Sequence, residues 1–461
     1  MIDNKIRASS SQSFSPSHWR VLSEAGKLKA VMIYDAAFSM WGLKLPFSGE
    51  HQLCWYTSKN VDYEESRKQY AQFRHFLGSE GAQIFDISEM AKKIIDNATL
   101  SEKKSIVEEI WGSKKQRPTP TGLTALHVMR GFPEYPRYEN GRIITPDFVR
   151  ANTYARDIAF VTQQGLIISK MRGYSRREQP KLVRLVAKRD KVLSKNLSLF
   201  WDADQDSSMQ QYEGTLEGGD VQVISADTIA CGIGQQTNIF GFTKLAEMLL
   251  REPKSRVRRV VGVKLPRSPA SIYMHLDTTI CFYDKGGAVV MPYLHESRLL
   301  KSMPRRKLLL ELLSALRRDL ERDDKNIDTS VPPSAFANVG ESIIMEKSGS
   351  EIKRRIVPSF IDFLIAEKLL DPNKIVLVGG QPRRENDVEH LVGALREQYT
   401  QAPNIVCLRP NVVLSYKRNT KTINALRQQG VKVREIPDAY LDLGGGPHCL
   451  TMPLSREELF D

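Results

Sequence analysis

Short apolar runs with the composition of β-strands alternate with amphipathic stretches of helical period, and this alternation constrains the fold more than any other feature. The run LKAVMIY at 28–34 precedes a helical stretch at 63–81, which is followed by the run AQIFDI at 82–87. The region 404–437 repeats the pattern near the end of the chain, where Gly430 ends the helical stretch. Strands and helices that alternate in this way pack as layers, so the pattern predicts an α/β protein.

Two regions stand apart because they are rich in helical pattern. We expect a helical insert around 88–145 and an extra helical segment around 300–330, and we assign no role to its basic part around 304–323. The N-terminus lacks the apolar core of a signal peptide, so 1–27 is predicted to be a flexible lead-in. The rest of the chain, 28–461, is long enough to bury a large core and is predicted to form a single domain.

Composition excludes several classes of protein. No apolar run approaches the roughly 18 residues that cross a bilayer, so no membrane span is expected. The formal net charge is +13, but the basic residues are interleaved with acidic and apolar ones and form no RNA-binding or zinc-finger pattern, which argues against a nucleic-acid partner. The five cysteines are scattered and form no CxxC pair. They argue against a disulfide framework or a structural zinc site and favour a reducing compartment, the cytoplasm.

Five polar residues lie in apolar or glycine-rich surroundings. They are Asp157 at the end of NTYARD, Glu217 in LEGGDV, His275 and Asp277 in MHLDTT, and Cys449 after GGGPH. Each has a structural explanation when taken alone, since aspartates cap turns, a lone histidine is often part of a core, and a cysteine packs as a small hydrophobe. On a strand, residues two positions apart share a face, so His275 and Asp277 are predicted to point the same way.

Together these residues predict a site for a planar cation. Three carboxylates in one pocket would repel one another unless a positive charge lay among them. A guanidinium fits, because its five N–H donors pair bidentately with carboxylates. A thiolate beside it can attack the central carbon, and a histidine can move protons to and from the departing nitrogen.

The order of these motifs resembles that of the guanidino-group-modifying enzymes, the superfamily of arginine deiminases, dimethylarginine hydrolases and amidinotransferases. The arginine deiminases are the most similar, and the resemblance extends from about residue 28 to the end of the chain. The motifs that carry it are YARD at 154–157, KMRGYSRREQP at 170–180, LEGGDV at 216–221, MHLDTTICFYD at 274–284, the region 404–433 and GGGPHCLTMPLSRE at 444–457.

The resemblance implies both a fold and a set of roles. The fold is a pentein-like propeller of five ββαβ blades around a central pocket, here with helical insertions. Cys449 is the implied nucleophile, Asp157 and Asp277 grip the guanidinium, His275 is the general acid and base, and Glu217 orients it. The implied chemistry needs no metal or organic cofactor.

The resemblance also implies residues that contact the rest of the substrate. Arg176 is the candidate partner for an α-carboxylate, because Gln236 and Gly444 stand where deiminases often carry further arginines. Asn152, just before YARD, and Gly446, in the glycine run, are further candidates for substrate contact.

The implied function is that of a cysteine-dependent hydrolase of the arginine deiminase type. It would convert arginine, or a related guanidino compound, to the ureido product and ammonia through a covalent amidino-cysteine intermediate. The alternative is an amidinotransferase that passes the amidine to an amine. A non-catalytic binding protein is less favoured, because all five reactive residues are present. The expected partner is a small guanidino compound, and the exact substrate and a homo-oligomeric state are left open.

Overall fold

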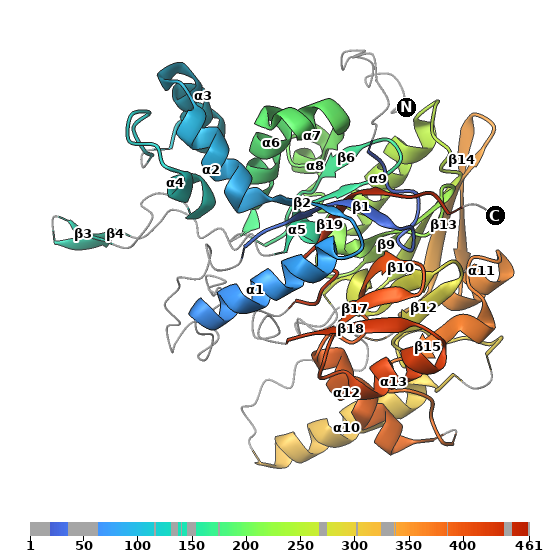
Figure 1. Cartoon of the computed structure of the whole chain (residues 1–461). Helices are drawn as coiled ribbons and strands as arrows, with labels where there is room; N and C mark the ends of the chain where they lie inside the picture. Colours follow the sequence, from blue (N-terminus) through green and yellow to red (C-terminus); the bar gives the residue numbers. More distant parts are fainter. Residues whose placement is uncertain are drawn as a thin grey trace.

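The computed structural model describes most of the chain. The described residues are 19–35, 63–114, 117–130, 137–139, 141–144, 154–173, 176–266, 274–300, 303–323, 336, 338–384, 386–437 and 445–459. Within them strands and helices alternate, as the sequence predicts, and the chain is a mixed α/β protein (Figure 1). No helix in these ranges is long and apolar enough to cross a membrane.

One strand arrangement occurs five times. In each group an antiparallel pair is extended by a third strand, parallel to the second. The groups are β19 (Met452–Arg456), β1 (Leu28–Ile33) and β2 (Gln83–Asp86); β5 (Ala159–Val161), β6 (Leu166–Ile168) and β7 (Leu199–Asp202); β8 (Val221–Val223), β9 (Thr228–Ile233) and β10 (Arg259–Lys264); β11 (Ile280–Asp284), β12 (Gly287–Val290) and β15 (Ile375–Leu377); β16 (Val406–Arg409), β17 (Val412–Tyr416) and β18 (Lys432–Ile436).

Helices connect the two parallel strands of each group, because parallel neighbours need a long crossover. The connecting helices are α1 (Tyr63–Gly78) in the first group, α6 (Gln179–Arg189) and α7 (Lys191–Asn196) in the second, α9 (Ile239–Arg251) in the third, and α13 (Thr420–Gln428) in the last. In the fourth group the crossover is long and contains α10 (Arg306–Asp323), the hairpin β13 (Ser342–Ser348) and β14 (Glu351–Val357), and α11 (Phe360–Ala366). That hairpin pairs with β10 and so widens the sheet of the third group to five strands.

Burial explains why these strands have apolar runs rather than alternating patterns. Every residue of β5, β6, β8, β11, β12 and β17 is buried. Strands that are covered on both faces need apolar side chains at almost every position. Gly430, which follows α13, has a φ of +77°, the left-handed conformation in which glycine ends a helix without steric cost.

The remaining described helices lie outside this repeating pattern. In the region of the expected insert are α2 (Ile87–Asn97), α3 (Leu100–Trp111) and α4 (Ala125–Arg130), with the hairpin β3 (Arg137–Glu139) and β4 (Arg142–Ile144) (Figure 1). Thr99 and Glu102 form a capping box that starts α3. Two further helices, α8 (Ser207–Gln211) and α12 (Val388–Tyr399), precede β8 and β16. Before β1, the segment around Val21 to Ala25 is buried.

Short segments that directly precede the first strands of the groups come together. They are α5 (Ala155–Ile158) before β5, the 3-10 turn η3 (Gly218–Asp220) before β8, the 3-10 turn η5 (Leu276–Thr278) before β11, and residues 445–451 before β19. α5 contacts η3, and η3 contacts η5. Four of the five groups therefore contribute the segment before their first strand to one shared location, and the five polar residues singled out from the sequence lie there.

Candidate active site

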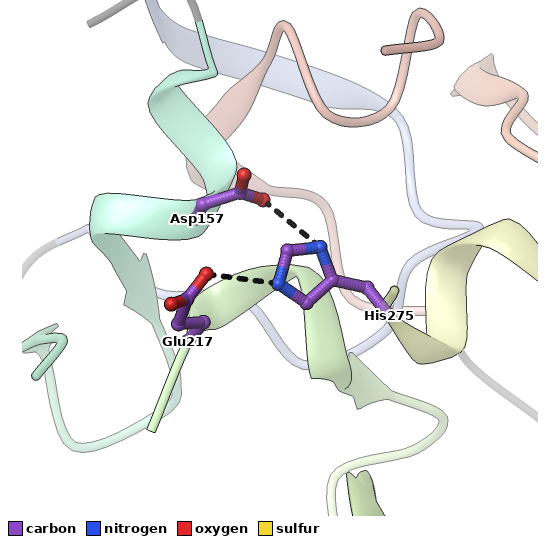
Figure 2. A group of neighbouring side chains, drawn as sticks. All are labelled: Asp157, Glu217 and His275. Atoms are coloured by element: carbon purple, nitrogen blue, oxygen red, sulfur yellow. Dashed lines mark hydrogen bonds and ion pairs between the residues drawn. The ribbon is translucent and has the colours of Figure 1, made fainter. Parts of the chain in front are cut away.

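The imidazole of His275 lies between two carboxylates (Figure 2). Its Nε2 is 3.0 Å from Glu217 Oε2, and its Nδ1 is 3.7 Å from Asp157 Oδ1. Burial alone would lower the pKa of His275, but the charges of Asp157 and Asp220 and the hydrogen bond to Glu217 raise it to about 10. The ring is therefore an imidazolium at neutral pH and holds a proton that it can donate.

The glycines of LEGGDV are needed for this contact. A Cβ on Gly219 would lie 2.7 Å from both Asp157 Oδ1 and His275 Nδ1. A Cβ on Gly218 would collide with the carbonyl oxygen of Arg156. Side chains at these positions would push the histidine and the carboxylate apart, so the two glycines allow the close approach of η3 to α5 and η5.

Arg176 places a guanidinium among the same acids. Its Nη1 donates to Asp157 Oδ2 at 2.8 Å and lies 3.5 Å from Glu217 Oε2, while its Nε donates to Gln179 Oε1 at 3.0 Å. The guanidinium carbon also lies 5.8 Å from the centre of the Tyr154 ring. The cation that the sequence predicts among the carboxylates is thus supplied, in this structure, by an arginine of the chain itself.

Cys449 lies on the other side of the site, next to Asp277. Its Sγ donates to Asp277 Oδ2 at 3.4 Å. Burial, and after it the negative charges of Asp277 and Asp157, raise the pKa of the Cys449 thiol well above its usual range. Without a ligand the thiol is protonated, and a cation bound between the two aspartates would favour the thiolate.

Two residues that contact Cys449 or Asp277 were not predicted from the sequence as site residues. Asn404 donates from Nδ2 to Cys449 Sγ at 3.1 Å and accepts from the Cys449 backbone N–H at 3.1 Å. His448 donates from Nδ1 to Asp277 Oδ2 at 2.9 Å. The signal that could have found Asn404 is its position just before β16, which matches the position of the other site residues before their first strands.

The strand prediction for His275 and Asp277 is wrong. His275 immediately precedes the 3-10 turn η5 and Asp277 is its middle residue, and β11 begins only at Ile280. Their side chains therefore have different partners, Glu217 for His275 and His448 for Asp277. Both residues still reach the site, because the turn brings them to the edge where Asp157 and Cys449 lie.

Two carboxylate oxygens in the site have unused hydrogen-bonding capacity. Asp157 Oδ1 and Asp277 Oδ1 are buried and have no hydrogen-bond partner within the described parts of the chain. A buried acceptor without a donor costs free energy, so such atoms mark a place that a ligand's donors can occupy. One of the two oxygens lies beside the histidine and the other belongs to the carboxylate that contacts the thiol.

Asp157, Glu217 and His275 are also the described residues whose ligand atoms approach one another closely enough, within 4.8 Å, to hold a metal ion. The groups that already contact these two carboxylates indicate which kind of ligand the site can bind. Both carboxylates already face the guanidinium of Arg176, and both accept an N–H of that group or of the imidazole. The geometry therefore suits a flat cation that donates several hydrogen bonds.

For the other residues that the sequence suggests as substrate contacts, the structure gives little evidence of a place in the site. Gln236 is half-buried, next to Thr237, whose hydroxyl accepts from the Glu217 backbone N–H at 3.1 Å. Gly446 is buried, and a Cβ there would collide with the Asn404 side chain, so its glycine is required by the protein's own packing. Asn152 and Gly444 lie outside the described residues.

Comparison with known proteins shows similarity to the arginine deiminases. The sequence model of the arginine deiminase family matches residues 146–310 and 343–456. The arginine deiminase of Staphylococcus epidermidis is 29% identical over 399 residues, which cover 83% of this chain and 84% of that protein. The enzyme of Mycoplasma capricolum is 26% identical over 466 residues, which cover 95% of this chain and 97% of that protein.

A solved structure also has a similar fold. An amidinotransferase of saxitoxin biosynthesis from Microseira wollei superposes with a TM-score of 0.51 over 96% of this chain and 99% of that one, at 14% sequence identity. At this identity the likeness concerns the fold alone.

Proposed function

The chain belongs to the arginine deiminase family, and from this premise we propose that it hydrolyses the guanidino group of arginine to give citrulline and ammonia. The observation that carries the proposal is a pair of buried carboxylate oxygens that have no hydrogen-bond partner among the described residues. One belongs to Asp157 and lies beside His275, and the other belongs to Asp277, whose carboxylate contacts the thiol of Cys449. Arginine brings a flat cation with five N–H donors, which is opposite in charge to these acceptors and has more than enough donors for both.

Capture of the substrate is assigned to the two aspartates. The Asp157 and Asp277 carboxylates accept N–H groups of the substrate, and Arg176 shares or leaves its place on Asp157. The added positive charge favours the thiolate of Cys449, which the two negative charges disfavour in the free protein. The thiol, which donates to Asp277 Oδ2 in the free protein, loses its proton to solvent as the substrate cation binds, and Asp277 stays ionised to hold the guanidinium.

Two attacks on the same carbon complete the proposed reaction. The Sγ lone pair forms a C–S bond, and the His275 imidazolium protonates the nitrogen that departs as ammonia, which leaves an amidino-thioether on Cys449. The neutral imidazole then takes a proton from water, and the hydroxide adds to the carbon. The C–S bond breaks, the thiolate leaves and the ureido product forms.

Glu217 and Asn404 orient the reacting groups in this scheme. The Glu217 carboxylate fixes the ring of His275 from Nε2 and keeps it protonated. Asn404 binds both the sulfur and the backbone N–H of Cys449, which fixes the direction of the thiol. Amine transfer instead of hydrolysis would use the same amidino-thioether. Water is the proposed acceptor, because the relatives that match over most of their length are deiminases.

We also propose that the five strand groups are the blades of a propeller around this site. Contacts between neighbouring groups support it: β19 with β5, α5 with η3, β8 with η5, β11 with β16, and β16 with β1. The proposed catalytic domain begins near residue 28 and runs to 461, with the buried segment around Val21 to Ala25 packed against it. A reducing compartment, the cytoplasm, suits the four cysteines that lie in the described part of the chain, which are buried free thiols.

The proposal is tested by product analysis. Purified protein is incubated with arginine and with a panel of other guanidino compounds, with and without added amines, and the products are identified by mass. We expect citrulline and ammonia from arginine, no amidine on the added amine, and no product with Cys449→Ser. Transfer of the amidine to an amine would replace hydrolysis by the transferase reaction, and turnover of a different guanidine alone would exclude arginine as the substrate.

A further inference from the structure

A second buried ion pair, which the proposed reaction does not use, adjoins Asp277. Glu24 and Arg156 form a bidentate pair, with distances of 3.1 and 3.2 Å from Nη1 and Nη2 to the two carboxylate oxygens. The ring of His448 joins this pair to the site, because its Nε2 lies 3.5 Å from Glu24 Oε2 and its Nδ1 donates to Asp277. All four side chains are buried.

These residues come from distant parts of the sequence and hold them together. Glu24 precedes β1, Arg156 lies in α5 beside Asp157, and His448 is the neighbour of Cys449. Arg156 also donates from Nε to the carbonyl of Thr451 at 3.1 Å, and its backbone N–H donates to the carbonyl of Cys449 at 3.2 Å. The pair is therefore fastened to the segment that carries the proposed nucleophile.

This arrangement favours the ionised form of the buried Asp277 carboxyl group. Asp277 is fully buried and must be ionised to bind a guanidinium, although burial favours its neutral form. The groups that face it are His448, Cys449, His275 and, further away, Arg156. Burial alone would raise the pKa of Asp277, but the hydrogen bond and charge of His448, followed by the charges of His275 and Arg156, lower it.

We propose that Glu24, Arg156 and His448 are positioning residues that keep Asp277 ionised and directed at Cys449, and so set substrate capture and the reactivity of the thiol. His448 acts directly, because its Nδ1–H occupies Oδ2 of Asp277 and leaves Oδ1 for the substrate. Glu24 acts through it, since its Oε2 lies 3.5 Å from Nε2 of the ring, and Arg156 holds the Glu24 carboxylate in place by the bidentate pair. The role in capture rests on the proposed function, whereas the effect on the thiol does not.

The test compares two substitutions of the ring. His448→Leu removes both ring nitrogens, whereas His448→Asn keeps an amide N–H where Nδ1 lies. We expect His448→Leu to raise KM for arginine by about 10-fold or more, the effect of losing a charge-assisted hydrogen bond at the binding carboxylate. The loss in kcat should be smaller. The acid limb of the kcat/KM profile should move to higher pH, because Asp277 is then harder to ionise. His448→Asn should restore most of both properties.

A second readout does not depend on arginine. The rate at which iodoacetamide alkylates Cys449, followed on its peptide by mass spectrometry at a fixed alkaline pH, reports the thiolate fraction. Without the His448 donor, the charge of Asp277 bears more strongly on the thiol, so alkylation of His448→Leu should be several-fold slower than in the wild type. Glu24→Gln leaves the charge of Arg156 unbalanced and should have the opposite effect, faster alkylation.

His390→Asn is the matched control. His390 is a buried histidine whose two nitrogens contact the Tyr293 hydroxyl and the Gly380 carbonyl, each at 2.8 Å, away from the site. This variant should lose stability but keep the wild-type pH profile and alkylation rate. If folded His448→Leu or Glu24→Gln behaves like this control, the inference is overturned. If His448→Leu does not fold, His448→Asn and Glu24→Gln decide the question through alkylation. If the wild type does not convert arginine but alkylation responds as expected, the proposed substrate is wrong, and the positioning role of Glu24, Arg156 and His448 stands.

Discussion

Replacement of Arg176 by alanine should separate two roles of this arginine. The sequence predicts that Arg176 binds the α-carboxylate of the substrate, but the structure places its guanidinium on Asp157, where the substrate's guanidinium is proposed to bind. A substrate that uses Asp157 fully must compete with Nη1. In Arg176→Ala this competition is removed, and any carboxylate anchor is removed with it.

The structure gives the size of each effect. One short charged hydrogen bond, 2.8 Å to Asp157 Oδ2, is broken, and the 3.5 Å approach to Glu217 adds little. A hydrogen bond of this kind is worth about 1.5–3 kcal/mol. The guanidinium group of a ligand should therefore bind about 10- to 100-fold more tightly once the competitor is absent. The folded protein should lose about 3–5 kcal/mol, because two buried carboxylates lose a cation.

The assay is calorimetric titration of arginine and of agmatine, its analogue without the carboxylate, in a Cys449→Ser background that prevents turnover. Agmatine should bind more tightly to the Arg176→Ala protein, whereas arginine gains less or loses affinity if Arg176 also anchors the carboxylate. Arg184→Ala is the control, since Arg184 pairs with Asp202 and Asp204 outside the site and should affect only stability. Weaker agmatine binding in Arg176→Ala would refute the competition, and an unchanged ratio of the two ligands would refute the anchor.

Three other outcomes follow from the same geometry. Cys449→Ser should abolish turnover and keep the fold, and wild-type protein trapped with arginine should carry an amidine on the Cys449 peptide; a Ser variant with most of its activity would exclude the covalent step. Asp157→Asn and Asp277→Asn should each weaken guanidinium binding by about 1.5–3 kcal/mol in the same titration, and normal binding by both would place the site elsewhere. The pKa of His275 is raised from 6.5 to about 10, so the stability from its protonated ring is complete below about pH 6.5 and is lost as the pH rises to about 10. Urea unfolding across this range should show the loss in the wild type but not in His275→Gln.

Much of the fold could be predicted because its signals are local. The runs that became β16 and β17 are mostly apolar, and β18 alternates between buried and more exposed residues. The helix α13, between β17 and β18, has a regular helical period, and Gly430 follows its last turn. The five reactive residues could be selected because charged, imidazole and thiol groups are conspicuous in apolar surroundings. Glu217, His275, Asp157, Asp277 and Cys449 all lie in one site, although on turns and a short helix rather than on strands.

The supporting residues could not be predicted, because their roles depend on contacts between distant segments. Asn404 is separated from Cys449 by 45 residues, and Glu24 from Arg156 by 132. In the sequence each resembles an ordinary loop or cap residue. From the sequence, the glycine run near the end of the chain is predicted to contact the substrate. The structure shows that Gly445 and Gly446 also make room for the side chains of Tyr154 and Asn404.

Neither the net charge of the chain nor an open cluster of acids in the site explains the capture of a cationic substrate. With a net charge of +13, the chain as a whole does not attract arginine from a distance. In the buried site the carboxylates of Asp157, Glu217 and Asp277 already have hydrogen bonds with Arg176, His275 and His448, so the substrate enters an existing hydrogen-bond network rather than an open cluster of acids. Salt at roughly 0.1 M screens the interaction of exposed charges that lie more than about 10 Å apart, but it acts weakly on buried pairs. Selectivity for a guanidinium must therefore come from short hydrogen bonds to the two unpaired oxygens, because a simple cation such as ammonium cannot reach both carboxylates with parallel donors.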